Sequence, residues 1–207
     1  MILPRPRLML ITDRHQARHG LDAAVEGALA GGCRWISVRD RDMSSRDRRS
    51  MARRIVKLAQ RYGAATTLHG DVAGAEAARA DGVHVGQGTS PGAVRDILGG
   101  TAFVGASVHS WDEAEYAQAH GADYVTVSPV FETRSKPGYG PALGLDILEE
   151  FCDALSTPVV ALGGITPDTA RDCLDAGAQA VAVMGEIMRA DDPRATTERY
   201  ISAMRLA

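Results

Sequence analysis

The chain has 207 residues, of which 45% are hydrophobic and 24% charged, with a formal net charge of -3. These values are typical of an ordinary globular domain with a sizeable core, and the slightly negative charge argues against a nucleic-acid or membrane partner. Three widely spaced cysteines, without a Cys-x-x-Cys pair, argue against a disulfide framework or a zinc site and favour a reducing compartment.

Short, continuously apolar runs alternate with helix-like segments along the whole chain. The runs predict strands over 8–12, 35–38, 65–68, 82–85, 103–106, 124–127, 158–162 and 180–184. Helices are predicted over 21–30, 44–62, 145–155 and 193–204, and helix starts at Ser90-Pro91, in a capping box over 110–113 and at Thr166-Pro167. Eight such units, without an odd strand or a Gly-rich turn after the first, favour a closed (βα)8 TIM barrel over an open doubly wound sheet. We expect one domain spanning residues 1–207.

The stretch 158–187 contains a strand, glycine and a helix start twice in succession. Gly163 and Gly164 follow the first strand, and Gly185 follows the second. Backbone N–H groups at such turns bind phosphate, and the loops after the seventh and eighth barrel strands often do so. We therefore expect a phosphate-binding cradle over 163–187. The alternative is that these glycines only permit tight turns.

Functional groups of a barrel belong at the carboxyl ends of its strands. Arg39 and Arg41 follow the second strand one residue apart, so both side chains face the same side and one anionic ligand. Lys136, in the long polar insertion 128–144, would reach that ligand from across the mouth. The alternative for the two arginines is surface ion pairing with the aspartates at 40 and 42.

Among the histidines, His69 is the best placed for chemistry. It lies at the tip of the third strand beside a glycine, and imidazole transfers protons near neutral pH. His84 falls inside the fourth strand and is expected to be a hydrogen-bonded histidine of the core or barrel lumen. His109 could be catalytic or could help to cap a helix. No histidine–carboxylate cluster has metal-ligand spacing, so no metal site is expected.

Several stretches resemble the thiamine phosphate synthase and thiazole tautomerase family over nearly the whole chain. They are LMLITD (8–13), VRDR (38–41), DGVHVGQ (81–87), GASVHS (105–110), GADYVTVSPVFETRSKPG (121–138) and PVVALGGITPD (158–168). The resemblance implies a βα barrel. It also implies ligand contacts from Arg39, Arg41, Ser107, Thr133, Ser135 and Lys136, and a thiazole phosphate held by the backbone of Gly164, Met184 and Gly185.

The two branches of that family do different chemistry. The synthase joins a pyrimidine pyrophosphate to a thiazole phosphate and releases pyrophosphate with Mg²⁺, whereas the tautomerase shifts a proton on a carboxythiazole phosphate. The synthase pattern has metal-binding carboxylates where this chain has Gly70 and Thr89, and Asp71 comes one position late. The usual glutamine of the second strand is replaced by Ser37.

The Arg-x-Arg spacing at 39–41, the Phe-Glu-Thr at 131–133 and the glycine after position 69 look more like the tautomerase branch. That branch has a histidine where this chain has Pro129. We expect a metal-independent thiazole tautomerase, an isomerase, with His69 and Lys136 as catalytic residues. Thiamine phosphate synthase, a transferase, is the alternative, and only this alternative would need Mg²⁺. A third hypothesis is a barrel that binds a heterocyclic phosphate without turnover.

The resemblance implies a small phosphorylated heterocycle as partner, without nucleic acid or membrane, and a homo-oligomer is possible. The apolar run at the N-terminus is too short for a signal peptide, and no segment approaches the length of a membrane span. We therefore expect a cytoplasmic protein.

Overall fold

The computed structural model describes residues 2–40, 42–133 and 141–205. Three of the predicted site residues, Arg41, Ser135 and Lys136, lie outside these ranges. Within them, eight parallel strands form a closed barrel in chain order, with β8 paired to β1. The strands are β1 (Leu8–Ile11), β2 (Trp35–Val38), β3 (Ala65–His69), β4 (Gly82–Val85), β5 (Phe103–Val108), β6 (Tyr124–Val127), β7 (Val159–Leu162) and β8 (Ala180–Val183). The predicted (βα)8 barrel is confirmed.

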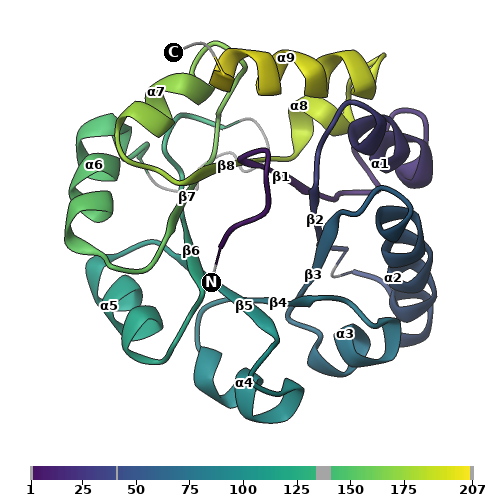
Figure 1. The fold of residues 1–207 in the computed structure, drawn as a ribbon, viewed down its shortest axis with the longest axis horizontal. Helices are drawn as coiled ribbons and strands as arrows, with labels where there is room; N and C mark the ends of the chain where they lie inside the picture. The colour runs from purple at the N-terminus through teal and green to yellow at the C-terminus, as the bar shows by residue number, and fades with distance from the viewer. Residues whose placement is uncertain (1, 41, 134–140, 206–207) are drawn as a thin grey trace.

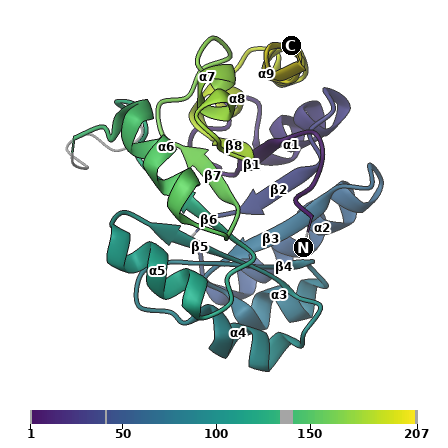
Figure 2. The same cartoon turned by 60° about the vertical axis from the view of Figure 1, so that its left-hand side comes forward.

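Helices surround the ring of strands on all sides (Figure 1), and Figure 2 shows the same arrangement after a 60° turn. They are α1 (Leu21–Ala30), α2 (Ser45–Gln60), α3 (Val72–Ala78), α4 (Pro91–Leu98), α5 (Trp111–Ala119), α6 (Gly144–Ala154), α7 (Ala170–Asp175), α8 (Gly185–Met188) and α9 (Pro193–Arg205). None of these helices, as far as the chain is described, combines the length and apolar character that a membrane crossing requires.

Side-chain caps fix several helix starts. Ser90 accepts a hydrogen bond from the Ala93 N–H, and Pro91 is the first residue of α4. The predicted capping box is also present, because Ser110 accepts from the Glu113 N–H at 3.3 Å. The Glu113 carboxylate, however, reaches back to the His109 N–H at 2.7 Å, one residue further than in the usual motif. This contact ties α5 to the end of β5.

The predicted helix start at Thr166-Pro167 is wrong. The helix α7 begins at Ala170, and the preceding residues form a turn. The Thr166 N–H donates to the Thr169 hydroxyl at 3.0 Å, and the Thr166 carbonyl accepts from the Ala170 N–H. The threonine that caps this turn is therefore Thr169, and the proline lies inside the turn rather than at the first helical position.

The strands bury side chains on both of their faces. Outward-facing residues such as Leu10, Val38 and Val125 pack with the helices in one large cluster. Inward-facing residues form a second cluster inside the barrel, which includes Trp35 and Tyr124. Leu3 belongs to this second cluster, and the N-terminal segment that carries it runs across the centre of the ring in Figure 1. The N-terminal segment thereby covers part of the amino ends of the strands, and in this fold the carboxyl ends are the functional ones.

The three cysteines form no disulfide, and their burial opposes formation of the reactive thiolate. Burial raises the pKa of Cys33 and of the half-buried Cys152 to about 11. A thiol with such a pKa is only about 0.1% thiolate at pH 8, and the thiolate is the nucleophile.

Alkylation by iodoacetamide at pH 8 is therefore expected to be roughly 10²-fold slower than for free cysteine. The rate should rise with pH toward 11, and all three cysteines should react rapidly in urea. Mass spectrometry of labelled peptides measures this. A cysteine labelled at the free-cysteine rate in the native protein would contradict the expectation.

Candidate functional site

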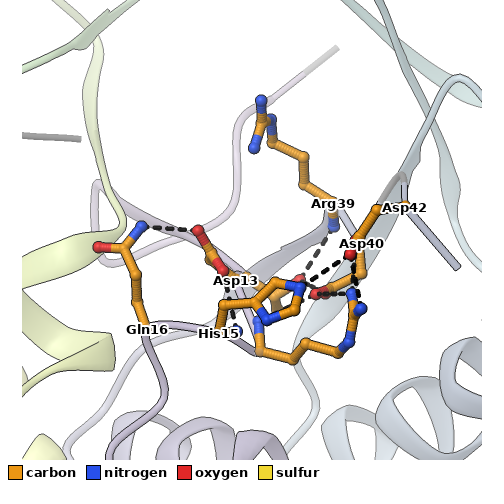
Figure 3. Close-up of polar contacts among 8 residues, drawn as sticks. Asp13, His15, Gln16, Arg39, Asp40 and Asp42 are labelled. Carbon is orange, nitrogen blue, oxygen red and sulfur yellow. Dashed lines mark hydrogen bonds and ion pairs between the residues drawn. The ribbon is translucent and has the colours of Figure 1, made fainter. Parts of the chain in front are cut away.

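Arg39 follows β2 and continues the inward-facing series that Trp35 and Ser37 begin, because side chains alternate along a strand. Its backbone N–H donates to the Thr12 hydroxyl at 2.9 Å, which fixes the end of β2 against the end of β1. Its guanidinium makes no hydrogen bond or ion pair with any part of the chain that the structure describes. Figure 3 shows this side chain pointing away from Asp40 and Asp42.

The two aspartates beside Arg39 are bound by a different arginine. The Arg14 guanidinium donates to both Asp42 carboxylate oxygens, at 2.5 and 2.6 Å, and lies 3.4 Å from Asp40. Asp40 also accepts from the Thr12 hydroxyl and from the Arg14 N–H, each at 2.9 Å. The predicted alternative, in which Arg39 pairs with these aspartates, is therefore wrong.

Hydrogen bonding to Asp42 raises the pKa of Arg14, and hydrogen bonds from Arg14 and then His15 hold the pKa of Asp42 well below its usual range. Both groups therefore stay charged throughout the neutral range. Figure 3 shows His15 beside Asp42, and Asp13 beside Gln16, at the same loop. The cluster satisfies the carboxylates and leaves the positive charge of Arg39 uncompensated by them.

His69 lies at the end of β3, inside the barrel and 8% exposed. Its Nε2 is 2.8 Å from the Ser37 hydroxyl, which also accepts from Thr67 at 3.0 Å. The ring lies 4.5 Å from that of His84, measured between centroids. His69 is thus at the boundary between lumen and mouth, and its catalytic role stays a prediction.

His84 is a hydrogen-bonded lumen histidine, as predicted. Its Nδ1 lies 3.0 Å from the Tyr124 hydroxyl and its Nε2 lies 2.8 Å from the Ser107 hydroxyl. Ser107 is half-buried and lines a cavity of about 300 Å³ at the carboxyl ends of β4 and β5. His109 helps to join two loops, since its Nδ1 contacts the Ser128 carbonyl at 2.9 Å. A larger cavity, about 530 Å³, lies at the amino ends of β3 to β5 and contains none of the predicted site residues.

The predicted phosphate cradle lies where β7 and β8 end. Gly163 and Gly164 have φ angles of 104° and 66°, in the region that favours glycine. A methyl group on Gly164 would also collide with the backbone of the loop after β6, at Phe131 and Glu132. Neither the Gly164 N–H nor the Gly185 N–H donates a hydrogen bond to a described residue. Close packing accounts for the two glycines after β7, and phosphate binding stays a prediction.

The remaining predicted residues flank these elements. Met184 continues the inward-facing series of β8 and is half-buried against both hydrophobic clusters. Thr133 is half-buried and is the last described residue before 134–140. Arg41, Ser135 and Lys136 are outside the described residues, so their predicted ligand contacts, and the catalytic role of Lys136, stay predictions.

The residues that replace the family's magnesium carboxylates do not fit a metal. Gly70 and Thr89 have no carboxylate, and the Asp71 carboxylate is already engaged. One Asp71 oxygen accepts from the Gly74 N–H at 2.8 Å, and the other accepts from Arg48 at 2.9 Å. Over the described ranges, no group of three or more His, Cys, Asp or Glu side chains could hold a metal ion.

Comparison with known proteins places this geometry in context. The family model described as thiamine monophosphate synthase matches residues 8–187. A putative thiamine-phosphate synthase of Geobacter sulfurreducens is 43% identical over 189 residues, covering 90% of this chain and 89% of the relative. A thiamine-phosphate synthase of Shouchella clausii is 36% identical over 201 residues, covering 96% of each chain. A thiamine phosphate pyrophosphorylase structure from Pyrococcus furiosus has a TM-score of 0.86 at 32% identity, covering 96% of this chain and 95% of that one.

The expectation of a thiazole tautomerase, an isomerase, is wrong. Relatives that are similar over nearly the full length carry the name of the transferase, which was the alternative. The expectation relied on short motifs and on the missing carboxylates at Gly70 and Thr89. Missing carboxylates remove one means of stabilising pyrophosphate, but guanidinium and hydroxyl groups also stabilise an anion that leaves, and Arg39 and Ser107 lie at the mouth.

Proposed function

The chain belongs to the thiamine monophosphate synthase family, and from this membership we propose that it is a transferase that joins a pyrimidine pyrophosphate to a thiazole phosphate. In this reaction the bond from the pyrimidine to pyrophosphate breaks, and a bond from the pyrimidine to the thiazole forms. Pyrophosphate departs with the bonding electrons. The observation that carries the proposal is the identity of 36% over 96% of both chains to a protein named thiamine-phosphate synthase.

We assign the two anionic ends of the substrates to two parts of the mouth. Arg39 and Ser107, at the ends of β2 and β5, face the pyrophosphate, and the turns around Gly164 and Gly185 hold the thiazole phosphate through backbone N–H groups. The support for the first assignment is the guanidinium of Arg39, which is not engaged by the neighbouring aspartates. The support for the second is the pair of N–H groups that have no acceptor among the described residues.

A metal held by carboxylates has no part in this proposal, because Gly70 and Thr89 offer none and Asp71 is bound to Arg48. Charge on the departing pyrophosphate is instead offset by cationic side chains. Thiamine phosphate formation is therefore expected to persist within about twofold when EDTA replaces Mg²⁺, since no step depends on a metal that the enzyme holds. Product formation from both substrates, followed by chromatography, measures this.

The variant Gly70→Asp/Thr89→Asp provides a matched comparison, because it restores both carboxylates of the family pattern. Its activity is expected to respond to Mg²⁺, whereas that of the parent protein is not. Strict Mg²⁺ dependence of the parent would contradict the cationic mechanism while leaving the transferase assignment intact. Tight binding of both substrates without any product would contradict the transferase assignment. It would favour the hypothesis of a barrel that binds a heterocyclic phosphate without turnover.

A further inference from the structure

A buried row of polar side chains crosses the barrel lumen beneath the proposed pyrophosphate site. Tyr124, on β6, is fully buried, and its hydroxyl lies 3.0 Å from His84 Nδ1 on β4. On the other side of the same imidazole, Nε2 lies 2.8 Å from the Ser107 hydroxyl on β5. The strand register sets Tyr124 and His84 level, because both pair with Gly105, which has no side chain to separate them, and Ser107 follows two residues later on β5. An unbroken row therefore connects a buried phenol with a serine at the mouth.

The packing around Tyr124 holds its hydroxyl in place. Trp35 meets the phenol ring edge-on, with centroids 4.7 Å apart, and Phe103 lies at 4.9 Å. Burial raises the pKa of Tyr124 above its usual value. The phenol therefore keeps its proton at every pH at which the protein would work. A neutral, immobile hydroxyl facing an imidazole nitrogen is able to donate a hydrogen bond to it throughout this pH range.

The direction of these hydrogen bonds follows from donor and acceptor strength. A phenol is the strongest neutral donor in the row, and an unprotonated imidazole nitrogen is the strongest neutral acceptor. Thr67 offers a weaker acceptor, and its own proton goes to Ser37. Tyr124 therefore donates to His84 Nδ1. A neutral imidazole has one proton, so it resides on Nε2 and is donated to the Ser107 oxygen.

We propose that Tyr124 and His84 are positioning residues that make the Ser107 hydroxyl a hydrogen-bond donor to the pyrophosphate group. The Ser107 oxygen accepts a hydrogen bond from the His84 Nε2–H. The hydroxyl proton of Ser107 therefore points into the mouth, toward the anion. With the opposite tautomer, Ser107 would give its proton to His84 and present lone pairs to the anion, which is repulsive. This inference rests on the proposed function, because it deepens the role of Ser107 in the same site.

Two further observations fit this arrangement. Ser107 is half-buried near the carboxyl end of β5, so part of the residue is open to a ligand at the mouth. Thr126 is a second hydroxyl near His84 Nε2, and it is 3.5 Å away, at the limit of a hydrogen bond. Of these two hydroxyls, Ser107 is the better placed to accept a hydrogen bond from Nε2.

The test combines a spectroscopic measurement with a double-mutant cycle. Nitrogen-15 NMR of the ligand-free protein, labelled at histidine, is expected to show His84 protonated at Nε2. Isothermal titration with inorganic pyrophosphate then compares the parent protein, Ser107→Ala, Tyr124→Phe and the double variant. We expect Ser107→Ala and Tyr124→Phe each to weaken binding by ~10-fold or more, as for loss of a hydrogen bond to a charged group. The double variant should be no weaker than Ser107→Ala, because Tyr124 acts only through Ser107.

Thr126→Val is the matched control, because it removes from the same strand a buried hydroxyl whose contact with His84 Nε2, at 3.5 Å, is at the limit of a hydrogen bond, and it should bind pyrophosphate like the parent protein. Additive effects of Tyr124→Phe and Ser107→Ala would overturn the proposal, since they would show a general structural role for Tyr124. A proton on His84 Nδ1 would overturn it even if every variant failed to fold. Failure of the parent protein to bind pyrophosphate would instead overturn the proposed function, whereas the tautomer is decided without any ligand.

Discussion

Replacing Arg39 by glutamine is expected to lower kcat/KM for the pyrimidine pyrophosphate by ~10²- to 10³-fold, the usual effect of removing a donor that stabilises charge in a transition state. The side chain continues the inward-facing series of β2, and it makes no polar contact with the described residues. Charge on the leaving group increases as its bond breaks, so the loss should affect kcat as well as KM. Steady-state kinetics of thiamine phosphate formation, with each substrate varied in turn, measures the effect.

Arg54→Gln is a suitable control, because Arg54 lies on the outer surface of α2 and pairs there with Asp22 at 3.0 Å. Its activity should match that of the parent protein. Arg39→Lys should recover part of the loss, since it retains the charge but not the planar pair of donors. If Arg39→Gln retained activity within about threefold, Arg39 would not contact the pyrophosphate group, and the assignment of this end of the mouth would fail.

The barrel could be predicted because its strands are short, apolar and evenly spaced, and local patterns of this kind depend on sequence alone. Two errors in the strand ends lie where polar side chains occur inside strands. β5 was predicted to end at Ala106 but continues through Ser107 to Val108, and β3 includes His69. The side chains of His69 and Ser107 point into the lumen while their backbones remain paired with the neighbouring strands. A strand predicted from its apolar residues therefore ends too early.

The contacts of the mouth could be predicted only in part. Side-chain alternation correctly puts Arg39 on one side of its strand and Asp40 on the other. It gives no information on which cation pairs with Asp40 and Asp42, because Arg14 comes from a loop distant in sequence. The only signal was a positive residue after the first strand, which neighbours the second in any such barrel.

The row of Tyr124, His84 and Ser107 was missed for a related reason. His84, Ser107 and Tyr124 all fall on the inward-facing positions of their strands, and alternation alone would have grouped them inside the barrel. The register of three strands brings them together. His84 and Tyr124 both pair with Gly105, and Ser107, two residues later on β5, pairs with Thr126. Register depends on the stagger of the closed barrel, and no local pattern specifies it.

The functional error has a chemical cause. The absence of carboxylates at Gly70 and Thr89 was interpreted as the absence of a reaction in which pyrophosphate leaves. One means of charge stabilisation was thereby treated as the only one, although cations and hydroxyl donors at the mouth offer another. Similarity over the whole chain compares many positions at once, whereas the choice of the tautomerase branch relied on a few motif residues.

Gly105→Ala is expected to destabilise the protein by about 3 kcal/mol, at the upper end of the usual cost of overpacking a core. The Tyr124 ring lies directly over Gly105, where a methyl group would collide with three of its carbons. The ring cannot move aside easily, since it is wedged against Trp35 and Phe103 and hydrogen-bonded to His84. For a chain of this size, the thermal midpoint should fall by roughly 10 °C. Differential scanning fluorimetry or circular dichroism measures it.

Gly100→Ala is the matched control, because a methyl group at Gly100 would have no neighbour within 4 Å. Its midpoint should be that of the parent protein. Shortening the opposing side chain, in Gly105→Ala/Tyr124→Leu, should cost less than the sum of the two single changes, because the added methyl group would occupy space that the ring leaves. Additive losses would mean that the methyl group meets something other than the ring. A Gly105→Ala protein with the same thermal midpoint as the parent protein would contradict the close approach of β5 and Tyr124. The alignment of His84 with Ser107 also depends on this approach.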